Sequence, residues 1–426
     1  MAKLVVKCVD MTNDGVGVAY YNNLPVYIPN FIVGEEAQIQ IVAKGYNKYF
    51  GKVVELYTKN DYRVNEECKF VSKCGGCQLQ HLSYEGQLKF KLNVVNKLFS
   101  LLGHQVNEIV GMDKPLFYRN KIMAPIKNNE RGFFALKSRK FNKIDTCLIE
   151  NYYGQKIIKT LLSLELGGLE YVYIRVGETS KDVLVCLVTK RHDDILDSAQ
   201  IETLVNKYPT IKTITQSIKT KNTNRVLGEE LKILYGDGFI KDFIHDICFK
   251  ISTNSFYQIN PKQTQKLYDL AIDFASLSSE DTVLDAYCGV GTISNMIARK
   301  VKKVEGVEIV EDAINNAIEN SKLNNITNTT YYCEDATAYI LNNKNYFDVI
   351  FVDPPRKGCS DEFLNALLES EAKKIVYISC NPETLVLNLQ VLLEKYELKN
   401  SILVDMFPQT HHVETIVLLC LKDAKK

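Results

Sequence analysis

The sequence predicts three structural units, of which the last is an α/β domain with a mostly parallel sheet. From about residue 255 onward, apolar strand-like runs alternate with helical segments at the spacing of βαβ units. Residues 1–58 instead alternate apolar and polar residues in short runs, which is typical of a small antiparallel barrel of four or five strands. We therefore expect a barrel over residues 1–58, a central α+β unit over residues 59–250 and the α/β domain over residues 251–426.

Length and composition limit the class of protein. A chain of 426 residues is too long for one compact core, and 46% hydrophobic with 24% charged residues is ordinary for a globular protein. No apolar run reaches the roughly 18 residues of a membrane helix, and the N-terminus lacks the features of a signal peptide. We expect a cytoplasmic protein with no membrane partner. Its 12 cysteines are then metal ligands, nucleophiles or core residues rather than disulfides.

The central unit begins with a Cys- and Gly-rich stretch that we expect to be an irregular loop. A helix is expected from Tyr84 to Leu102, because apolar residues recur there at helical spacing and Gly103 follows as a stop. Residues 119–143 then hold eight basic residues against one acid, Glu130. Phosphate contacts with base stacking would explain this mixture, and so would a solvated strand face with aromatic residues in the core. The basic residues are Arg119, Lys121, Lys127, Arg131, Lys137, Arg139, Lys140 and Lys143, with Phe117, Tyr118, Phe133, Phe134 and Phe141 interleaved.

In the α/β domain, each predicted strand ends in a polar residue. The segment DTVLDAYCGVGT contains a strand ending at Asp285, a Gly-rich turn and the start of a helix, and Glu308 ends the next strand 23 positions later. The following strands end near Asp335, at Asp353 and at Cys380. In an open parallel sheet these ends meet at one crevice, where an acid can bind ribose hydroxyls. The succession resembles the class I S-adenosylmethionine methyltransferases, which have a Rossmann-like sheet. A Rossmann dehydrogenase is disfavoured, because DPPR and SCNP have no place in hydride transfer.

Cys380 and Glu414 are candidates for covalent catalysis at that crevice. Carbon 5 of a pyrimidine is a poor nucleophile, and a thiolate that adds to carbon 6 activates it. A base must then remove the carbon-5 proton so that the thiol can leave. A core position is the commonest fate of a lone cysteine. The Asn-Pro pair after Cys380 ends the strand and favours a place at the crevice instead.

A second group of cysteines has the spacing of metal ligands. CKFVSKCGGC contains three cysteines as C-x5-C-x2-C, and the fourth ligand would come from KIDTCLIE. Four thiolates suit an iron–sulfur cluster or zinc. Zinc is the structural alternative on spacing alone.

Together these motifs resemble one family over almost the full chain: the RNA uracil-C5 methyltransferases of bacteria, in particular the iron–sulfur-containing enzymes of ribosomal RNA. The barrel resembles the TRAM domain, an OB-like RNA-binding module. The segments that carry the resemblance are CGGCQLQHLSYEGQLKFK, SFYQIN, LDAYCGVGT, VDPPRKG, SCNPETL and HHVET.

The resemblance implies a role for each candidate residue. Cys380 would be the nucleophile and Glu414 the proton-abstracting base. The residues expected to bind S-adenosylmethionine are Gln258, Tyr287, Glu308 and Asp335, with Asp353 lining the site that they share. The residues expected to hold a [4Fe–4S] cluster, with a structural and RNA-folding role, are Cys68, Cys74, Cys77 and Cys147. The helix over Tyr84–Leu102 would pack on the catalytic domain.

The expected reaction is methyl transfer from S-adenosylmethionine to carbon 5 of a uridine in 23S ribosomal RNA, before or during ribosome assembly, by a monomeric enzyme. Relatives that modify the T-loop of transfer RNA commonly lack the barrel and the cysteine group, which favours the ribosomal target. The alternatives are a transfer RNA uracil methyltransferase, a base amino-group methyltransferase, and an RNA-binding assembly factor with a vestigial site. Amino-group enzymes usually place an aromatic residue after DPP, where this chain has Arg356.

The chain departs from the family pattern just after the nucleophile motif. Leu387 and Asn388 stand where the family usually carries an Arg-Asp pair. A salt bridge or an RNA contact from that helix would therefore be missing.

Overall fold

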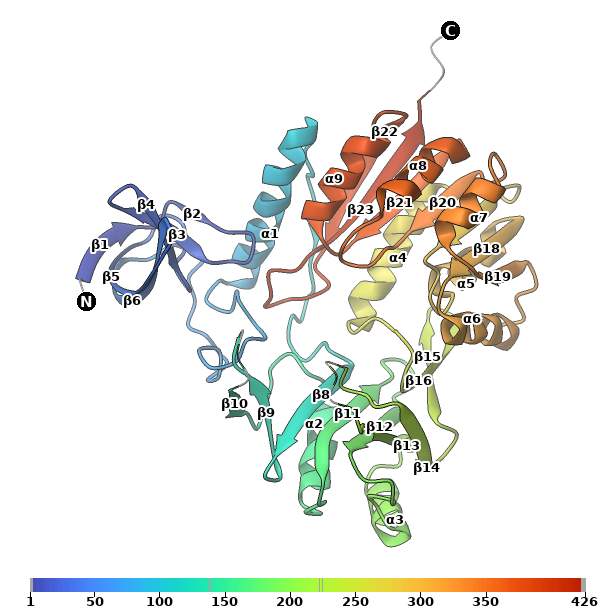
Figure 1. Cartoon of the computed structure of the whole chain (residues 1–426), viewed down its shortest axis with the longest axis horizontal. Coiled ribbons are helices and arrows are strands. Elements are labelled where there is room, and N and C mark those ends of the chain that lie inside the picture. Colours follow the sequence, from blue (N-terminus) through green and yellow to red (C-terminus); the bar gives the residue numbers. More distant parts are fainter. Residues whose placement is uncertain (1–2, 137, 139, 222, 224, 423–426) are drawn as a thin grey trace.

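The computed structural model describes residues 3–136, 138, 140–221, 223 and 225–422. Figure 1 shows three lobes: the N-terminal strands, the central sheet, and the C-terminal α/β lobe, with helix α1 between the first and the last. Lys137 and Arg139 of the basic segment lie outside the described residues. No helix in the described ranges is long and apolar enough to span a membrane.

The N-terminal lobe is one sheet in the order β1-β5-β6-β4-β3-β2. Its apolar interior includes Val26, Ile28, Phe31 and Ile39, which are fully buried. The prediction of four or five antiparallel strands is wrong in two respects, because the described residues form six strands and β4 pairs with β6 in parallel. The strands are β1 (Lys3–Lys7), β2 (Asp10–Met11), β3 (Gly17–Tyr21), β4 (Leu24–Ile28), β5 (Glu36–Gly45) and β6 (Lys48–Thr58).

The cysteine-rich stretch leads into α1 (Tyr84–Phe99), which continues as the 3-10 turn η1 (Ser100–Leu102). Ser83 caps the helix by accepting a hydrogen bond from the Gly86 N–H. Gly103 ends it in the left-handed conformation, with φ 69°. The predicted helix over Tyr84–Leu102 is therefore confirmed.

Helix α1 packs on the C-terminal lobe against α9, and its Val95 and Phe99 are part of that lobe's core. Lys91 is fully buried and pairs with Asp405 at 2.5 Å. The chain after α1 forms β7 (Ile109–Val110), which pairs in parallel with β22 and adds a strand to the C-terminal sheet. The expected packing of this helix on the C-terminal domain thus includes a strand that the sequence pattern did not predict.

The central lobe is a mixed sheet in the order β10-β9-β8-β11-β12-β13-β14. Helices α2 (Tyr152–Leu162) and α3 (Ser198–Lys207) belong to it, and their apolar residues share one core with strands β8 and β11–β13. The strands are β8 (Lys121–Lys127), β9 (Glu130–Phe134), β10 (Phe141–Lys143), β11 (Leu169–Val176), β12 (Val183–Thr189), β13 (Ile211–Ile218) and β14 (Glu230–Tyr235).

The C-terminal sheet has the order β19-β18-β17-β20-β21-β23-β22-β7, with β19 to β21 parallel and β23 antiparallel to both neighbours. The mostly parallel α/β prediction is confirmed. The strands are β17 (Thr282–Ala286), β18 (Lys303–Glu308), β19 (Thr329–Cys333), β20 (Val349–Val352), β21 (Lys374–Ser379), β22 (Tyr396–Val404) and β23 (Glu414–Leu421). The hairpin β15 (Phe239–Ile244) and β16 (Ile247–Ser252) precedes them, and the helices are α4 (Pro261–Ala275), α5 (Thr292–Ile297), η2 (Ala298–Lys300), α6 (Glu311–Leu323), α7 (Ala336–Asn342), α8 (Asp361–Ser370) and α9 (Pro382–Leu392).

The N-terminal lobe is fixed against the rest of the chain by apolar and polar contacts. Met11 and Ile32 of this lobe share a buried cluster with Leu79 and Leu82 of the following segment. The turn between β2 and β3 also reaches α9, where the Asn13 amide donates to the Glu383 carboxylate at 2.6 Å. The N-terminal lobe therefore lies close to the start of the helix that follows Cys380.

Candidate active site

The Gly-rich turn after β17 adopts an unusual backbone. Tyr287, Gly289 and Gly291 all have positive φ, at 66°, 52° and 73°. Only glycine occupies this region at little cost, so Tyr287 is held there by its surroundings. A Cβ placed on Gly289 would meet no atom within 4 Å. The turn therefore leaves open space beside its backbone, as a closely approaching ligand requires.

Backbone hydrogen bonds orient the acids at the ends of three strands. Asp285 is buried and accepts hydrogen bonds from the Ser294 N–H at 2.9 Å and hydroxyl at 2.6 Å, and burial raises its pKa to about 6. Glu308 accepts from the two N–H groups that follow it, and Asp335 caps α7. Each carboxylate is thus held at the carboxyl end of its strand.

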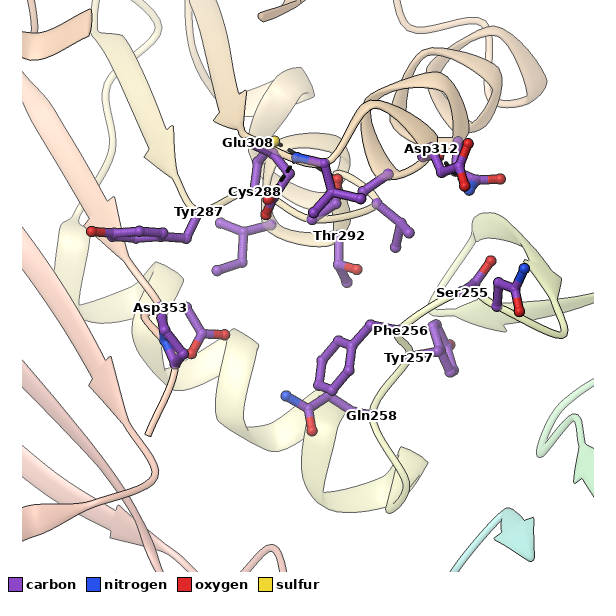
Figure 2. Close-up of a pocket in the computed structure, with 18 of the residues that line it drawn as sticks. Ser255, Phe256, Tyr257, Gln258, Tyr287, Cys288, Thr292, Glu308, Asp312 and Asp353 are labelled. Atoms are coloured by element: carbon purple, nitrogen blue, oxygen red, sulfur yellow. Dashed lines mark hydrogen bonds between the residues drawn. The ribbon is translucent and has the colours of Figure 1, made fainter. Parts of the chain in front are cut away.

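All seven predicted catalytic and cofactor residues line one cavity of about 1260 Å³. They are Gln258, Tyr287, Glu308, Asp335, Asp353, Cys380 and Glu414. Figure 2 shows Gln258 and Asp353 on one side of the space, with Tyr287 and Glu308 across it. Ligand pockets for small molecules typically measure roughly 300–1,000 Å³. The cavity is thus large enough for a cofactor together with part of a larger substrate.

Burial and neighbouring charges shift the protonation of Cys380, Glu414 and Asp353. Burial, followed by the charge of Asp353, raises the pKa of Glu414 to about 8, while Arg356 opposes the shift. Burial, followed by the charges of Glu414 and Asp353, raises the pKa of the Cys380 thiol to about 12, again against Arg356. Burial, followed by the charge of Asp285, raises the pKa of Asp353. The thiol and the two carboxyl groups therefore share one poorly solvated site, in which Arg356 favours the charged forms of Cys380 and Glu414.

The loop after β20 is tied to the helix that follows Cys380. The Arg356 carbonyl accepts a hydrogen bond from the Asn381 amide at 3.1 Å. Asn388, which is buried, accepts from the Cys359 N–H at 2.9 Å and from the Tyr377 hydroxyl at 2.8 Å. The residue that departs from the family pattern thus holds the loop that carries Asp353 and Arg356. Leu387 beside it is 62% exposed.

The loop between β22 and β23 is held by hydrogen bonds from α1 and from the cysteine-rich segment. Gln409 has a φ of 72° and exchanges two hydrogen bonds with the Gln87 side chain, at 3.0 and 2.9 Å. Its carbonyl accepts from the N–H groups of Gln78 and Leu79, at 3.0 and 3.1 Å. The cysteine-rich segment and α1 thereby hold a strained backbone five positions before Glu414.

The four cysteines of the predicted metal site are free thiols of intermediate exposure. They lie close enough to interact electrostatically, since Cys68 and Cys74 raise the pKa of Cys77, and Cys77 raises that of Cys147. Within the described ranges, however, no three His, Cys, Asp or Glu side chains are arranged to hold a metal ion. Neither the single-zinc alternative nor the cluster is confirmed.

Some residues of the basic and aromatic segment 117–143 lie in the core and others lie at the surface, so each explanation of its composition holds for part of it. Tyr118 and Arg131 are buried, and Arg131 forms an ion pair with Glu150 at 2.6 Å. Phe134 is 43% exposed, and Arg119 lines the cavity. The segment thus contributes both to the core and to the surface beside the crevice.

Four further residues of the site were not predicted as functional: Phe256, Tyr268, Arg356 and His412 all line the cavity. Phe256 is 71% exposed in the cavity wall (Figure 2), and Arg356 contacts His412 at 3.1 Å. Three of these residues, Phe256, Arg356 and His412, lie in the motifs SFYQIN, VDPPRKG and HHVET. Because these motifs carry the family resemblance, they could have indicated that the three residues are functional.

Three comparisons place the chain among known proteins. Residues 133–422 match the family described as tRNA (uracil-5-)-methyltransferase. The chain belongs to this family. Proteins named as uncharacterized RNA methyltransferases from Bacillus cereus and Staphylococcus aureus strain MRSA252 are each 39% identical to it, over 96% and 97% of this chain and 95% and 97% of theirs. A Pyrococcus abyssi tRNA (uracil-54, C5)-methyltransferase, solved with S-adenosyl-L-homocysteine, is similar in structure with a TM-score of 0.78 and 27% identity, over 97% of this chain and 99% of that one.

This family member is therefore an S-adenosylmethionine-dependent enzyme that methylates carbon 5 of uracil in RNA. The predicted family and reaction class are confirmed. A dehydrogenase, a base amino-group enzyme and a vestigial factor do not agree with this family membership.

Replacing Asn388 with alanine should destabilise the methyltransferase and slow methyl transfer. The change leaves the buried Cys359 N–H and Tyr377 hydroxyl without their acceptor, which costs about 1–3 kcal/mol. Urea denaturation measures the loss. Asn388→Asp retains an acceptor oxygen and should stay closer to the unchanged chain.

The control is Leu387→Ala on the exposed neighbour, which should change stability by less than about 0.5 kcal/mol. Equal stability of the Asn388→Ala and Leu387→Ala proteins would contradict the role given to Asn388.

Proposed function

We propose that this methyltransferase acts through a covalent adduct between Cys380 and carbon 6 of the target uridine, with Glu414 as the base. The observation that carries the proposal is the shared cavity: Cys380 follows β21, Glu414 begins the adjacent strand β23, and the Glu414 charge acts on the Cys380 thiol. Thiol addition needs a base across the pocket. This pair supplies both groups.

The reaction follows from these two side chains. The Cys380 thiolate adds to carbon 6, the double bond between carbons 5 and 6 opens, and carbon 5 becomes a carbanion stabilised as an enolate. S-adenosylmethionine, when bound, supplies the methyl group that this carbon takes. Glu414 then removes the proton from carbon 5, the double bond re-forms, and the bond from carbon 6 to the Cys380 sulfur breaks. Burial raises the pKa of both groups, and the Arg356 charge opposes that rise, which favours the thiolate and the carboxylate that these steps use.

The other cavity residues form the proposed cofactor site. Glu308 lies at the end of β18, where an acid accepts hydrogen bonds from ribose hydroxyls. The open turn at Gly289 gives a ligand access to the backbone beside Tyr287. Asp335 follows the end of β19, and Gln258 and Asp353 line the same cavity. This donor set fits a nucleoside with a charged methionine part.

We propose 23S ribosomal RNA as the substrate, with the barrel over residues 1–58 as a TRAM-like RNA-binding module. The resemblance to iron–sulfur-containing ribosomal RNA enzymes supports this target. Transfer RNA is the second candidate, because the Pyrococcus transfer RNA enzyme aligns over 97% of this chain. That coverage weakens the expectation that transfer RNA enzymes lack the barrel and cysteine segment.

We also propose that Cys68, Cys74, Cys77 and Cys147 hold a [4Fe–4S] cluster. Four free thiols from two separate segments gather in one place, which supports the proposal. Four thiolates suit an iron–sulfur cluster or a zinc ion, and the resemblance to iron–sulfur-containing relatives favours the cluster.

RNA that contains 5-fluorouridine should trap the enzyme. Fluorine at carbon 5 cannot leave as a proton does, so the adduct with Cys380 should persist and appear on a denaturing gel. Cys380→Ala should form no adduct and no 5-methyluridine, whereas Cys420→Ala, at a cysteine on the far part of β23, should behave as the unchanged chain.

Glu414→Gln should still methylate once but release RNA about 100- to 10,000-fold more slowly, since a general base is removed. Normal release by this variant, or methylation by Cys380→Ala, would exclude the proposed mechanism.

The substrate is tested by mapping 5-methyluridine in RNA from cells with and without this protein. Loss of one or two sites in 23S ribosomal RNA, with transfer RNA unchanged, is the expected result. Loss of 5-methyluridine from transfer RNA alone would show that transfer RNA, and not 23S ribosomal RNA, is the substrate.

Anaerobically purified protein should be brown and contain about four irons per chain. Cys147→Ser should lower the iron content, while Cys333→Ser, at an exposed cysteine elsewhere, should not. Colourless protein without iron would refute the cluster.

A further inference from the structure

Three cationic side chains converge beside the Phe256–Ile259 segment. Lys121 on β8 and Arg175 on β11 are paired residues in neighbouring strands, so their side chains lie on the same face of the sheet. Burial, followed by the charges of Arg175 and Arg119, lowers the pKa of Lys121 to about 8. Like charges opposite each other destabilise a sheet. The structure thus keeps a cluster that costs stability.

Arg175 is the most constrained member of this cluster. Only 1% of it is exposed, and its Nη1 donates to the Asn120 side chain and the Tyr257 carbonyl, both at 3.0 Å. Its Nε and Nη2 atoms are buried without a hydrogen-bond partner. A buried guanidinium with unpaired donors is unfavourable unless a polar partner arrives.

Carboxylates do not neutralise the cluster. No ion pair to Arg119, Lys121 or Arg175 occurs among the residues that the structure describes. Glu150 lies near Arg119 but already pairs with Arg131, and Asp242 accepts from three backbone N–H groups. The three cations therefore have capacity for an external anion.

The cluster lies directly behind residues of the active site. The Asn120 N–H donates to the Ile259 carbonyl at 2.9 Å, and its amide donates to the Gln258 carbonyl at 3.3 Å. Phe256 and Gln258 face the cavity (Figure 2), and Arg119 lines it. Lys121 and Arg119 are partly exposed, and Arg119 lines the cavity, so an anion can reach Arg119 from the cavity and Lys121 from the solvent beside it.

We propose that Arg119 and Lys121 form a subsite for a backbone phosphate of the RNA, next to the target uridine, and that the buried charge of Arg175 behind them strengthens it. The inference rests on the proposed function for the identity of the RNA. A phosphodiester keeps its charge at all relevant pH values and accepts several hydrogen bonds from guanidinium and ammonium groups. It would offset the repulsion between the three cations.

The test compares RNA binding by the unchanged chain and by Lys121→Gln, using a short uridine-containing single-stranded RNA and fluorescence anisotropy at several salt concentrations. Loss of one phosphate contact should weaken binding by roughly tenfold and reduce the slope of log affinity against log salt by about 0.7. The matched control is Lys373→Gln, at an exposed lysine just before β21 and thus at the opposite edge of the sheet from Cys380. It should change neither value.

Two further readouts separate this subsite from other roles. Calorimetry should give the same S-adenosylmethionine affinity for Lys121→Gln, and its melting temperature should not fall, because a like-charge contact is removed. An unchanged salt slope would overturn the proposal. In that case weaker cofactor binding would assign the cations to the cofactor carboxylate, and a lower melting temperature would assign Lys121 to folding. Because binding is measured without turnover, failure to form 5-methyluridine would overturn the proposed function and not this inference.

Discussion

The buried ammonium group of Lys91 is the contact on which the arrangement of the crevice depends. It lies 2.5 Å from one Asp405 oxygen and donates to the Phe407 carbonyl at 3.2 Å, while the Tyr84 hydroxyl donates to the other Asp405 oxygen at 2.9 Å. Removing one partner of such a buried pair leaves an uncompensated charge, at about 3–5 kcal/mol. Helix α1 is thus bound to the start of the segment that ends at Glu414. A helix from the first quarter of the sequence thereby fixes the position of a group near its end.

The charges of the crevice are divided between its two sides. On the catalytic side, burial favours the neutral forms of Cys380, Asp353 and Glu414. On the side behind Phe256, Arg119, Lys121 and Arg175 have no ion pair with a carboxylate in the described part of the chain. An RNA strand is repelled by ionised acids and attracted by free cations. Both halves of this arrangement therefore favour entry of the polyanionic substrate before any group changes its protonation state.

Site residues could be predicted from the sequence where the secondary structure itself determines their position. Asp353, Cys380 and the acids of β17 and β18 could be predicted because each lies at the carboxyl end of a parallel strand, and such ends meet. Helix α1 could be bounded by its apolar period and Gly103. Strand β7 could not, because two residues carry no period and the strand forms only by pairing with β22. Arg175 lies in the run YVYIRVGE, whose apolar residues predicted a strand correctly but gave no reason to expect a buried charge. Asn388 could not be interpreted from the sequence either. It departs from the family pattern, yet its side chain is buried and accepts hydrogen bonds from the Cys359 N–H and the Tyr377 hydroxyl.

The docking of the barrel has a consequence for how a target nucleotide is selected. Met11 and Ile32 anchor the barrel through an apolar cluster, and Asn13 contacts the helix that begins just after Cys380. The barrel surface and the nucleophile are therefore held at a constant separation. An RNA segment that binds the barrel would present only nucleotides at a matching distance to Cys380, so the enzyme would measure spacing along the folded RNA as well as recognise a base.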